Sequence, residues 1–270
     1  MASIVGVLLA SHASAEAQGR LDARYTVTLA GIPIGKGAWV IDIADDQFTA
    51  AASGQTAGLL QVFASGQGSG ASRGFIVSGS PVPSTFGAKI SSDKKTDEIR
   101  MSFAGGHVKD YAYDPPTPPH PERIPVTEAH RRNVLDPMTG SLHRVAPGAE
   151  LFGPDACPRS VAVFDGRMRY DLQFAYKRVD RVKAEKGYEG PAVVCTVYFA
   201  PVSGFIPSRA AIRYLIEQRD MEAWLVPVAG TRVMVPFRVS IPTPIGLGVL
   251  QAVQFVTNSQ PSRASGTRTQ

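Results

Sequence analysis

Apolar and polar residues alternate one by one through long stretches of this chain, and this two-residue period restricts the fold more than any other feature. Successive side chains of a β-strand point to opposite faces, so such runs predict strands with one buried face. The clearest runs are Tyr25–Leu29, Trp39–Ile43, Ile99–Phe103, Tyr170–Tyr176 and Val233–Ile241. Because they recur along nearly the whole chain, the sequence predicts a mainly β protein.

Short turn signals join these runs, so consecutive strands are expected to lie antiparallel. The strongest signal is Asp165-Gly166, since Asp-Gly is the preferred centre of a type I′ hairpin and glycine adopts positive φ without steric cost. Few segments favour helices: 57–64 and 138–145 fit short ones, and 208–219 fits either a helix or a strand. We therefore expect an antiparallel sheet accompanied by one or two short helices.

The first fifteen residues have the pattern of a secretory signal peptide. A short apolar run, 4–10, is followed by Ala13-Ser14-Ala15, a small-x-small cleavage site. About seven apolar residues are too few to span a bilayer, which needs about twenty. No Lys or Arg precedes Arg20, so we expect this signal peptide to be truncated at its N-terminus. The pattern predicts a signal peptide at 1–15 and export to the periplasm, and the competing interpretation is the frayed N-terminus of a cytoplasmic protein.

The rest of the chain, 16–258, is long enough to form a single antiparallel β domain. One segment interrupts the alternation, because 114–125 contains six prolines in twelve residues. Proline cannot donate to a sheet ladder, so this segment predicts an extended loop that either crosses between two halves of one sheet or separates two domains. The residues 259–270 are mostly small and polar and predict a disordered tail.

The chain has two cysteines, Cys157 and Cys195. An even pair in an exported protein is normally joined as a disulfide. A redox pair would favour a Cys-x-x-Cys spacing, which this sequence lacks. Two distant thiols also make a poor metal site. The pair therefore predicts a structural disulfide.

The formal net charge of +5 is modest, and the basic residues are scattered. Such a charge is compatible with an anionic membrane surface, but nothing else in the sequence favours nucleic-acid binding. The densest basic group lies within 177–186, where Asp180 and Glu185 are interleaved with it. This pattern is typical of a solvated strand end and turn.

One pentapeptide, Gly70-Ala71-Ser72-Arg73-Gly74, matches the Gly-x-Ser-x-Gly pattern of serine hydrolases. In those enzymes the serine occupies a turn between a strand and a helix. Here a β-prone run, Phe75-Ile76-Val77, follows the pentapeptide instead. A bulged or closely packed strand is the favoured interpretation, and a hydrolase that uses Ser72 with a later histidine is the alternative.

Four histidines follow that pentapeptide, and none of them stands at a metal-ligand spacing such as His-x-x-x-His. They are His107, His120, His130 and His143. The sequence predicts exposed loop histidines, and neither a metal nor another cofactor is expected.

Four blocks of sequence together resemble one exported bacterial family. They are the strand and turn at Tyr25–Gly35, Asp136-Pro137 before a short helix, Val163–Leu172 after Cys157, and the stretch from Tyr188 through Cys195 to Phe199. The set is similar to the family called domain of unknown function 3108, over about 24–258. The resemblance implies a periplasmic protein and supplies no reaction. By analogy with other envelope proteins, it implies a large curved antiparallel sheet, either an open barrel or a β-spiral.

These inferences predict a non-enzymatic periplasmic protein of the cell envelope. A curved sheet has to cover its inner face, and one or two helices are too few to do so. We expect the concave face to bind an apolar or lipid ligand, or a segment of an envelope protein. The alternatives are a closed core without a cavity and a purely structural component of an envelope complex. The candidate ligand residues are Trp39, Ile41, Met101, Phe103, Tyr170, Leu172, Phe174, Val235 and Phe237.

Overall fold

The computed structural model describes residues 18–58, 65–158 and 160–260, and these ranges contain one sheet of fifteen strands. The sheet order is β7-β6-β5-β4-β3-β2-β1-β15-β14-β13-β12-β10-β9, with β8 paired to β14 and β11 to β15. The strands are β1 Gln18–Leu29, β2 Ile32–Ile43, β3 Gln47–Thr56, β4 Gly66–Val77, β5 Ser80–Ser92, β6 Thr96–Ala104, β7 His107–Asp114, β8 His143–Arg144, β9 Ser160–Phe164, β10 Arg169–Lys183, β11 Lys186–Gly187, β12 Glu189–Ser203, β13 Met221–Pro227, β14 Val233–Thr243 and β15 Gly246–Gln260.

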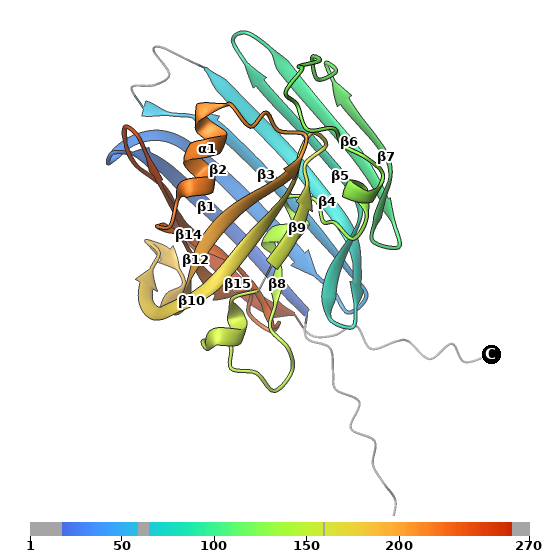
Figure 1. The fold of residues 1–270 in the computed structure, drawn as a ribbon. Helices are drawn as coiled ribbons and strands as arrows, with labels where there is room; N and C mark the ends of the chain where they lie inside the picture. The colour runs from blue at the N-terminus through green and yellow to red at the C-terminus, as the bar shows by residue number, and fades with distance from the viewer. Residues whose placement is uncertain (1–17, 59–64, 159, 261–270) are drawn as a thin grey trace, which may run out of the picture.

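The alternation in the sequence predicted this architecture correctly. All five predicted runs lie inside strands, and the pairing is antiparallel except between β11 and β15. The sheet curls so that β9, β10 and β12 pass in front of β1 to β4 (Figure 1). The mainly β, curved and open sheet inferred from the family resemblance is therefore confirmed.

Helical structure is sparse in the described ranges. The ambiguous segment 208–219 contains the α-helix α1, Ala210–Glu217. The segment 138–145 forms only the 3-10 turn η3, Thr139–Ser141, before β8 begins. Most of the predicted helix at 57–64 lies outside the described residues, as does the predicted signal peptide at 1–15. No described helix is long and apolar enough to cross a membrane.

The two edge strands of the sheet, β7 and β9, are connected by a long crossing segment. Its proline-rich part, after Asp114, contains no strand, which agrees with the missing amide donors of proline. Further along, the segment lies between the two edges: Val134 N donates to Gly106 O (3.2 Å), and Leu135 N donates to Ala162 O (2.8 Å). The part of the crossing segment around Val134 and Leu135 thus bridges the two edges of the sheet, which do not pair directly with each other.

The core consists of three clusters of buried apolar side chains. The largest joins β1–β3 to β14 and β15, and it includes Ile41, Phe237 and Phe255. A second lies under 145–157 and includes Cys195, which is joined to Cys157 by the predicted disulfide. The third joins β5–β7 to Val134 and Phe164. The crossing segment therefore contributes to each cluster and fills part of the space inside the curled sheet.

The hairpin predicted at Asp165-Gly166 exists, but its turn type was predicted wrongly. Strands β9 and β10 pair antiparallel, with Arg169 opposite Phe164, so four residues form the loop. Gly166 has φ +90°, whereas Asp165 does not have the positive φ that a type I′ turn requires. Instead, Asp165 Oδ1 accepts the amides of Arg167 (2.8 Å) and Met168 (2.7 Å). The carboxylate organises this turn in addition to the glycine.

The C-terminal strand also continues further than expected. Residues 259 and 260, which the sequence placed in the tail, pair with Gly19 and Gln18 at the end of β15. The remainder of the predicted tail lies outside the described residues.

Candidate functional site

The structure divides the nine predicted ligand residues among separate places and does not gather them into one surface. Ile41, Val235 and Phe237 are completely buried in the first core cluster, with Trp39 packed against it. Met101 and Phe103 are buried in the third cluster. Tyr170, Leu172 and Phe174 remain half-buried on β10. These last three residues share one face of β10, and of the other six predicted residues only Trp39 is also partly exposed.

Two further residues, both on β12, complete a continuous apolar surface with these three. Leu172 lies opposite Phe199 in the β10–β12 pairing, and Phe174 lies opposite Val197. The rings of Tyr170 and Phe199 contact each other with centroids 5.4 Å apart. We call Tyr170, Leu172, Phe174, Val197 and Phe199 the apolar strip. Sequence reasoning missed Val197 and Phe199 as ligand candidates, although their two-residue spacing after Cys195 was a usable signal.

The strip begins where burial along β12 ends. Residues 192–195 are all 0 % exposed, whereas every residue from 196 to 201 is partly exposed. The buried half packs against two core clusters at once, because Val194 belongs to the first and Cys195 to the second. Past Cys195 burial is incomplete, although Val197 and Phe174 still pack against the second cluster. One continuous strand thus passes from closed core to accessible apolar surface.

His143 adjoins the strip and is not the exposed loop histidine that the sequence predicted. Its ring meets Phe174 edge-on, with centroids 5.1 Å apart, and the residue is 8 % exposed. Burial lowers the pKa of His143 to about 4, so the ring is neutral at pH 7. At the other end of the strip, burial raises the pKa of Tyr170, and the nearby carboxylates of Asp165 and Asp136 raise it further. One end of the strip therefore adjoins a neutral histidine ring, and the other end is a neutral tyrosine.

Ser72, the residue of the hydrolase-like pentapeptide, is buried in the middle of β4 and not on a strand-to-helix turn. Its hydroxyl donates to Asp136 Oδ2 (3.0 Å) and lies 2.9 Å from Thr139 Oγ1. The register with β5 shifts next to it, between Arg73 and Gly74, as expected of a bulged strand. No histidine is among the hydrogen-bond partners of Ser72 in the described ranges. The contacts of Ser72 with Asp136 and Thr139 attach η3 to β4.

Asp136 is the centre of that attachment. Its Oδ1 accepts the amides of Met138 (2.9 Å) and Thr139 (3.0 Å), and its Oδ2 accepts the Thr139 hydroxyl (2.5 Å). Burial raises the pKa of Asp136, and these hydrogen bonds oppose the rise. In the same region, Met138 passes over Gly70: a Cβ there would lie 3.6 Å from its Cε. The small residues of β4 thus accommodate the crossing segment, which agrees with the closely packed strand that the sequence predicted.

A second candidate region is polar. A cleft of about 700 Å³ is lined by Arg24, Lys36 and Lys89, by neutral polar side chains and glycines, and also by Tyr25, Ala38 and Val253. A second cleft, of about 400 Å³, lies between the end of β10 and strands β13–β15 and shares Val253 with the first. The described residues contain no group of three or more His, Cys, Asp or Glu that could hold a metal ion. Neither the strip nor the clefts therefore offer an acidic or thiol-rich ligand set.

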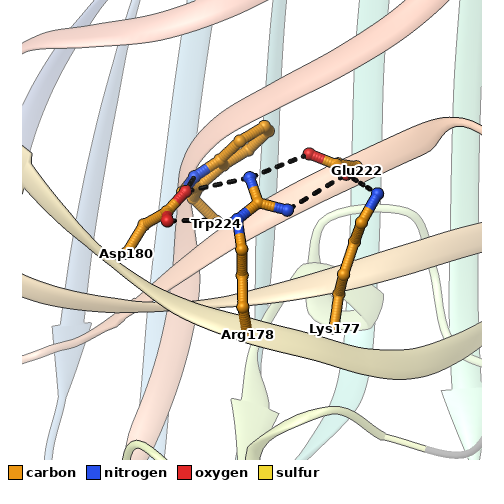
Figure 2. Close-up of polar contacts among 5 residues, drawn as sticks. All are labelled: Lys177, Arg178, Asp180, Glu222 and Trp224. Atoms are coloured by element: carbon orange, nitrogen blue, oxygen red, sulfur yellow. Dashed lines mark hydrogen bonds and ion pairs between the residues drawn. The ribbon is translucent and has the colours of Figure 1, made fainter.

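The basic group at the end of β10 is more ordered than the sequence predicted. Figure 2 shows Arg178 between Asp180 and Glu222, and Lys177 also pairs with Glu222. Trp224 Nε1 donates to Asp180 Oδ2 (2.8 Å). The hydrogen bond from Arg178 is the main cause that lowers the pKa of Asp180. These contacts attach the end of β10 to β13, and sequence reasoning missed them because the partners are more than forty residues away.

The Trp224 ring also lies between two arginines. The guanidinium of Arg178 is 5.6 Å from the ring centroid, and that of Arg238 is 4.8 Å from it. Cation–π contacts of this kind are weakly stabilising at a surface and stronger when desolvated. They hold Arg238 at the edge of the second cleft.

Comparisons with known proteins give a family and no activity. The family model described as "Protein of unknown function (DUF3108)" matches residues 24–253, which is most of the chain. A search of curated proteins finds no match. Among solved structures, the chain is similar to a β-barrel-like protein of the domain of unknown function DUF1849 from Brucella abortus. The two share 9 % identity with a TM-score of 0.44, over 90 % of this chain and 98 % of that one.

Proposed function

Since the chain belongs to the DUF3108 family, whose function is unknown, we propose from its geometry that it is a non-enzymatic binding protein of the bacterial periplasm. The pattern at 1–15 supports export. The disulfide between Cys157 and Cys195 supports an oxidising compartment. The burial of Ser72 supports a binding role over hydrolysis, because a nucleophile has to reach its substrate.

The ligand of this protein is apolar and binds along the strip on β10 and β12. The observation that carries the proposal is the change in burial within β12, from 0 % exposure at Cys195 to partial exposure at Val197 and Phe199. An aliphatic and aromatic surface that stays accessible in a folded protein marks a binding site more often than a surface of scattered single residues does. A lipid acyl chain matches a surface of this kind, because burying it removes apolar area from water on both partners.

Lipid extraction tests the proposal. Protein exported to the periplasm and purified without detergent is extracted with organic solvent, and the extract is analysed by mass spectrometry. We expect a stoichiometric lipid in the parent and a reduced amount in Leu172→Ser. A matched control, Val179→Ser, changes an apolar side chain that is 43 % exposed on the same strand and outside the strip.

Equal lipid in both variants would locate the ligand elsewhere. A parent protein that carries no lipid and binds no added fatty acid would reject the apolar ligand. In that case, co-purification of one envelope protein lost in Leu172→Ser alone would identify a partner segment as the occupant.

A further inference from the structure

A row of polar side chains crosses the sheet on the face opposite to Tyr25. The register places these residues side by side on seven consecutive strands, from β14 to β5. The row is Arg238, Gln251, Thr26, Lys36, Gln55, Gln67 and Ser91. Neighbouring strands are about 4.8 Å apart, so the row is roughly 30 Å long. A second polar row runs beside it and includes Arg24, Ser53, Ser69 and Lys89. We call the two rows together the polar track.

The track is recessed over most of its length. The 700 Å³ cleft is lined by both rows from β1 to β5, and the 400 Å³ cleft continues it to Arg238 under the end of β10. Gly37, Gly54 and Gly68 are paired with one another on β2, β3 and β4, in the same row as Tyr25. Side chains at these positions would point to the opposite face of the sheet, so it is that face on which their absence leaves space. A recessed, elongated polar surface fits a chain-like ligand better than a single small ion.

The charge of the track is positive and incompletely neutralised. Three basic and no acidic side chains line the larger cleft. Of these, Lys89 pairs with Glu98 (2.7 Å), whereas Arg24 and Lys36 form no ion pair in the described part of the chain. The smaller cleft is of mixed charge, since Asp180 and Glu185 line it together with Arg181, Lys183 and Arg238. There the buried Nε of Arg238 has no hydrogen-bond partner, although its guanidinium lies on Trp224 and interacts electrostatically with Asp180. Unpaired guanidinium and ammonium groups along a groove attract an anion and raise its local concentration.

We propose that the polar track binds an extended anionic polysaccharide. Its basic groups are spaced along the row, so they suit a polymer with intermittent carboxylates or phosphates, which arginine and lysine recognise well. The positions between them are amides and hydroxyls, which both donate to and accept from sugar hydroxyl groups. Nucleic acid fits less well, because it carries a charge at every phosphate and binding proteins stack its bases on exposed aromatic rings. Trp224, at the end of the row, is only 7 % exposed.

Titration calorimetry with an octamer of galacturonate tests this proposal. The parent is compared with Arg24→Gln/Lys36→Gln and with a control of equal net charge, Lys94→Gln/Lys109→Gln, which changes exposed lysines outside both clefts. We expect the track variant to weaken binding at least tenfold and the control to stay within twofold of the parent. A second variant, Gln55→Ala/Gln67→Ala, should weaken binding while leaving the charge unchanged.

The proposal would be overturned by no binding by the parent, by equal losses in the track and control variants, or by tighter binding of a single-stranded DNA octamer. Equally tight binding of neutral maltooctaose would also contradict an anionic ligand. Circular dichroism confirms that each variant is folded. Binding of a fatty-acyl probe by Arg24→Gln/Lys36→Gln should match that of the parent, since the proposed apolar site uses other residues.

Discussion

The two halves of β12 differ in burial: residues 192–195 form an uninterrupted apolar run, whereas Val197 and Phe199 recur at a two-residue spacing on one face. From Ala192 to Cys195, core clusters cover both faces and no side chain reaches solvent. The pairing with β13 stops at Val197, and beyond it the strand pairs only with β10. The difference teaches that β-periodicity specifies which side chains share a face, whereas the third segment that packs on that face decides whether it is core or binding surface.

The largest expected effect is in the closed region. Phe237 is fully buried and contacts the rings of Tyr188 and Phe255. Phe237→Ala should therefore lower the free energy of unfolding by about 3–5 kcal/mol, since it removes transfer energy and leaves a cavity. A urea melt measures the change. A loss below about 1 kcal/mol would mean that the core around Phe237 is as open as the strip.

His143 lies where the two regions meet, and its titration gives the next largest effect. Its pKa is lowered from 6.5 to about 4 by burial, so the unfolded chain takes up a proton that the folded protein excludes. Stability should accordingly decrease as the pH falls from 6.5 towards 4, by about 3 kcal/mol from this group. Melts of the parent and His143→Phe across this range measure it. If the pKa of His143 is lowered by burial, the parent loses this stability as the pH falls and His143→Phe does not.

The disulfide joins the segment around Cys157, which covers the buried half of β12, to Cys195 in that strand. Cys157→Ser should lower the free energy of unfolding by about 2 kcal/mol, towards the low end for native disulfides because this domain is large. The burial of Val193 and Leu225 depends on the segment that Cys157 holds, so the loss should appear as unfolding of that half. Thiol titration of native protein that was produced in the periplasm of an expression host provides the check: two reactive thiols would contradict the bond.

Gly166 sets the turn that leads into the strip. It has φ +90°, and an added Cβ would lie 2.8 Å from Ile99 Cγ2. Gly166→Val should cost more than about 1 kcal/mol from positive φ alone. Gly105→Val is the matched control, since Gly105 also has positive φ but nothing lies within 4 Å of its Cβ position. Equal losses in the two variants would show that the contact with Ile99 is unimportant.

Local sequence patterns predicted the strands, the hairpin at β9–β10 and the cysteine pairing, because each depends on residues close in sequence or on a unique partner. They could not show that Ile41 and Phe237 are core while Leu172 is accessible, since all three alternate in the same way. That distinction comes from packing between distant segments: Phe237 lies against Tyr188 and Phe255, and Leu142 of the crossing segment belongs to the same cluster as Ile41. Likewise, the polar track depends on the register of seven strands, which no single run specifies.

The most direct test of the account is Phe199→Ser, studied by urea melt and by titration with a fluorescent fatty-acyl probe. Because Phe199 is partly exposed, this change should cost at most about 1 kcal/mol of stability. The parent should bind the probe, and Phe199→Ser should bind it at least tenfold more weakly. A destabilisation as large as that of Phe237→Ala, together with no probe binding by the parent, would show that the strip is ordinary core and would contradict the proposed function.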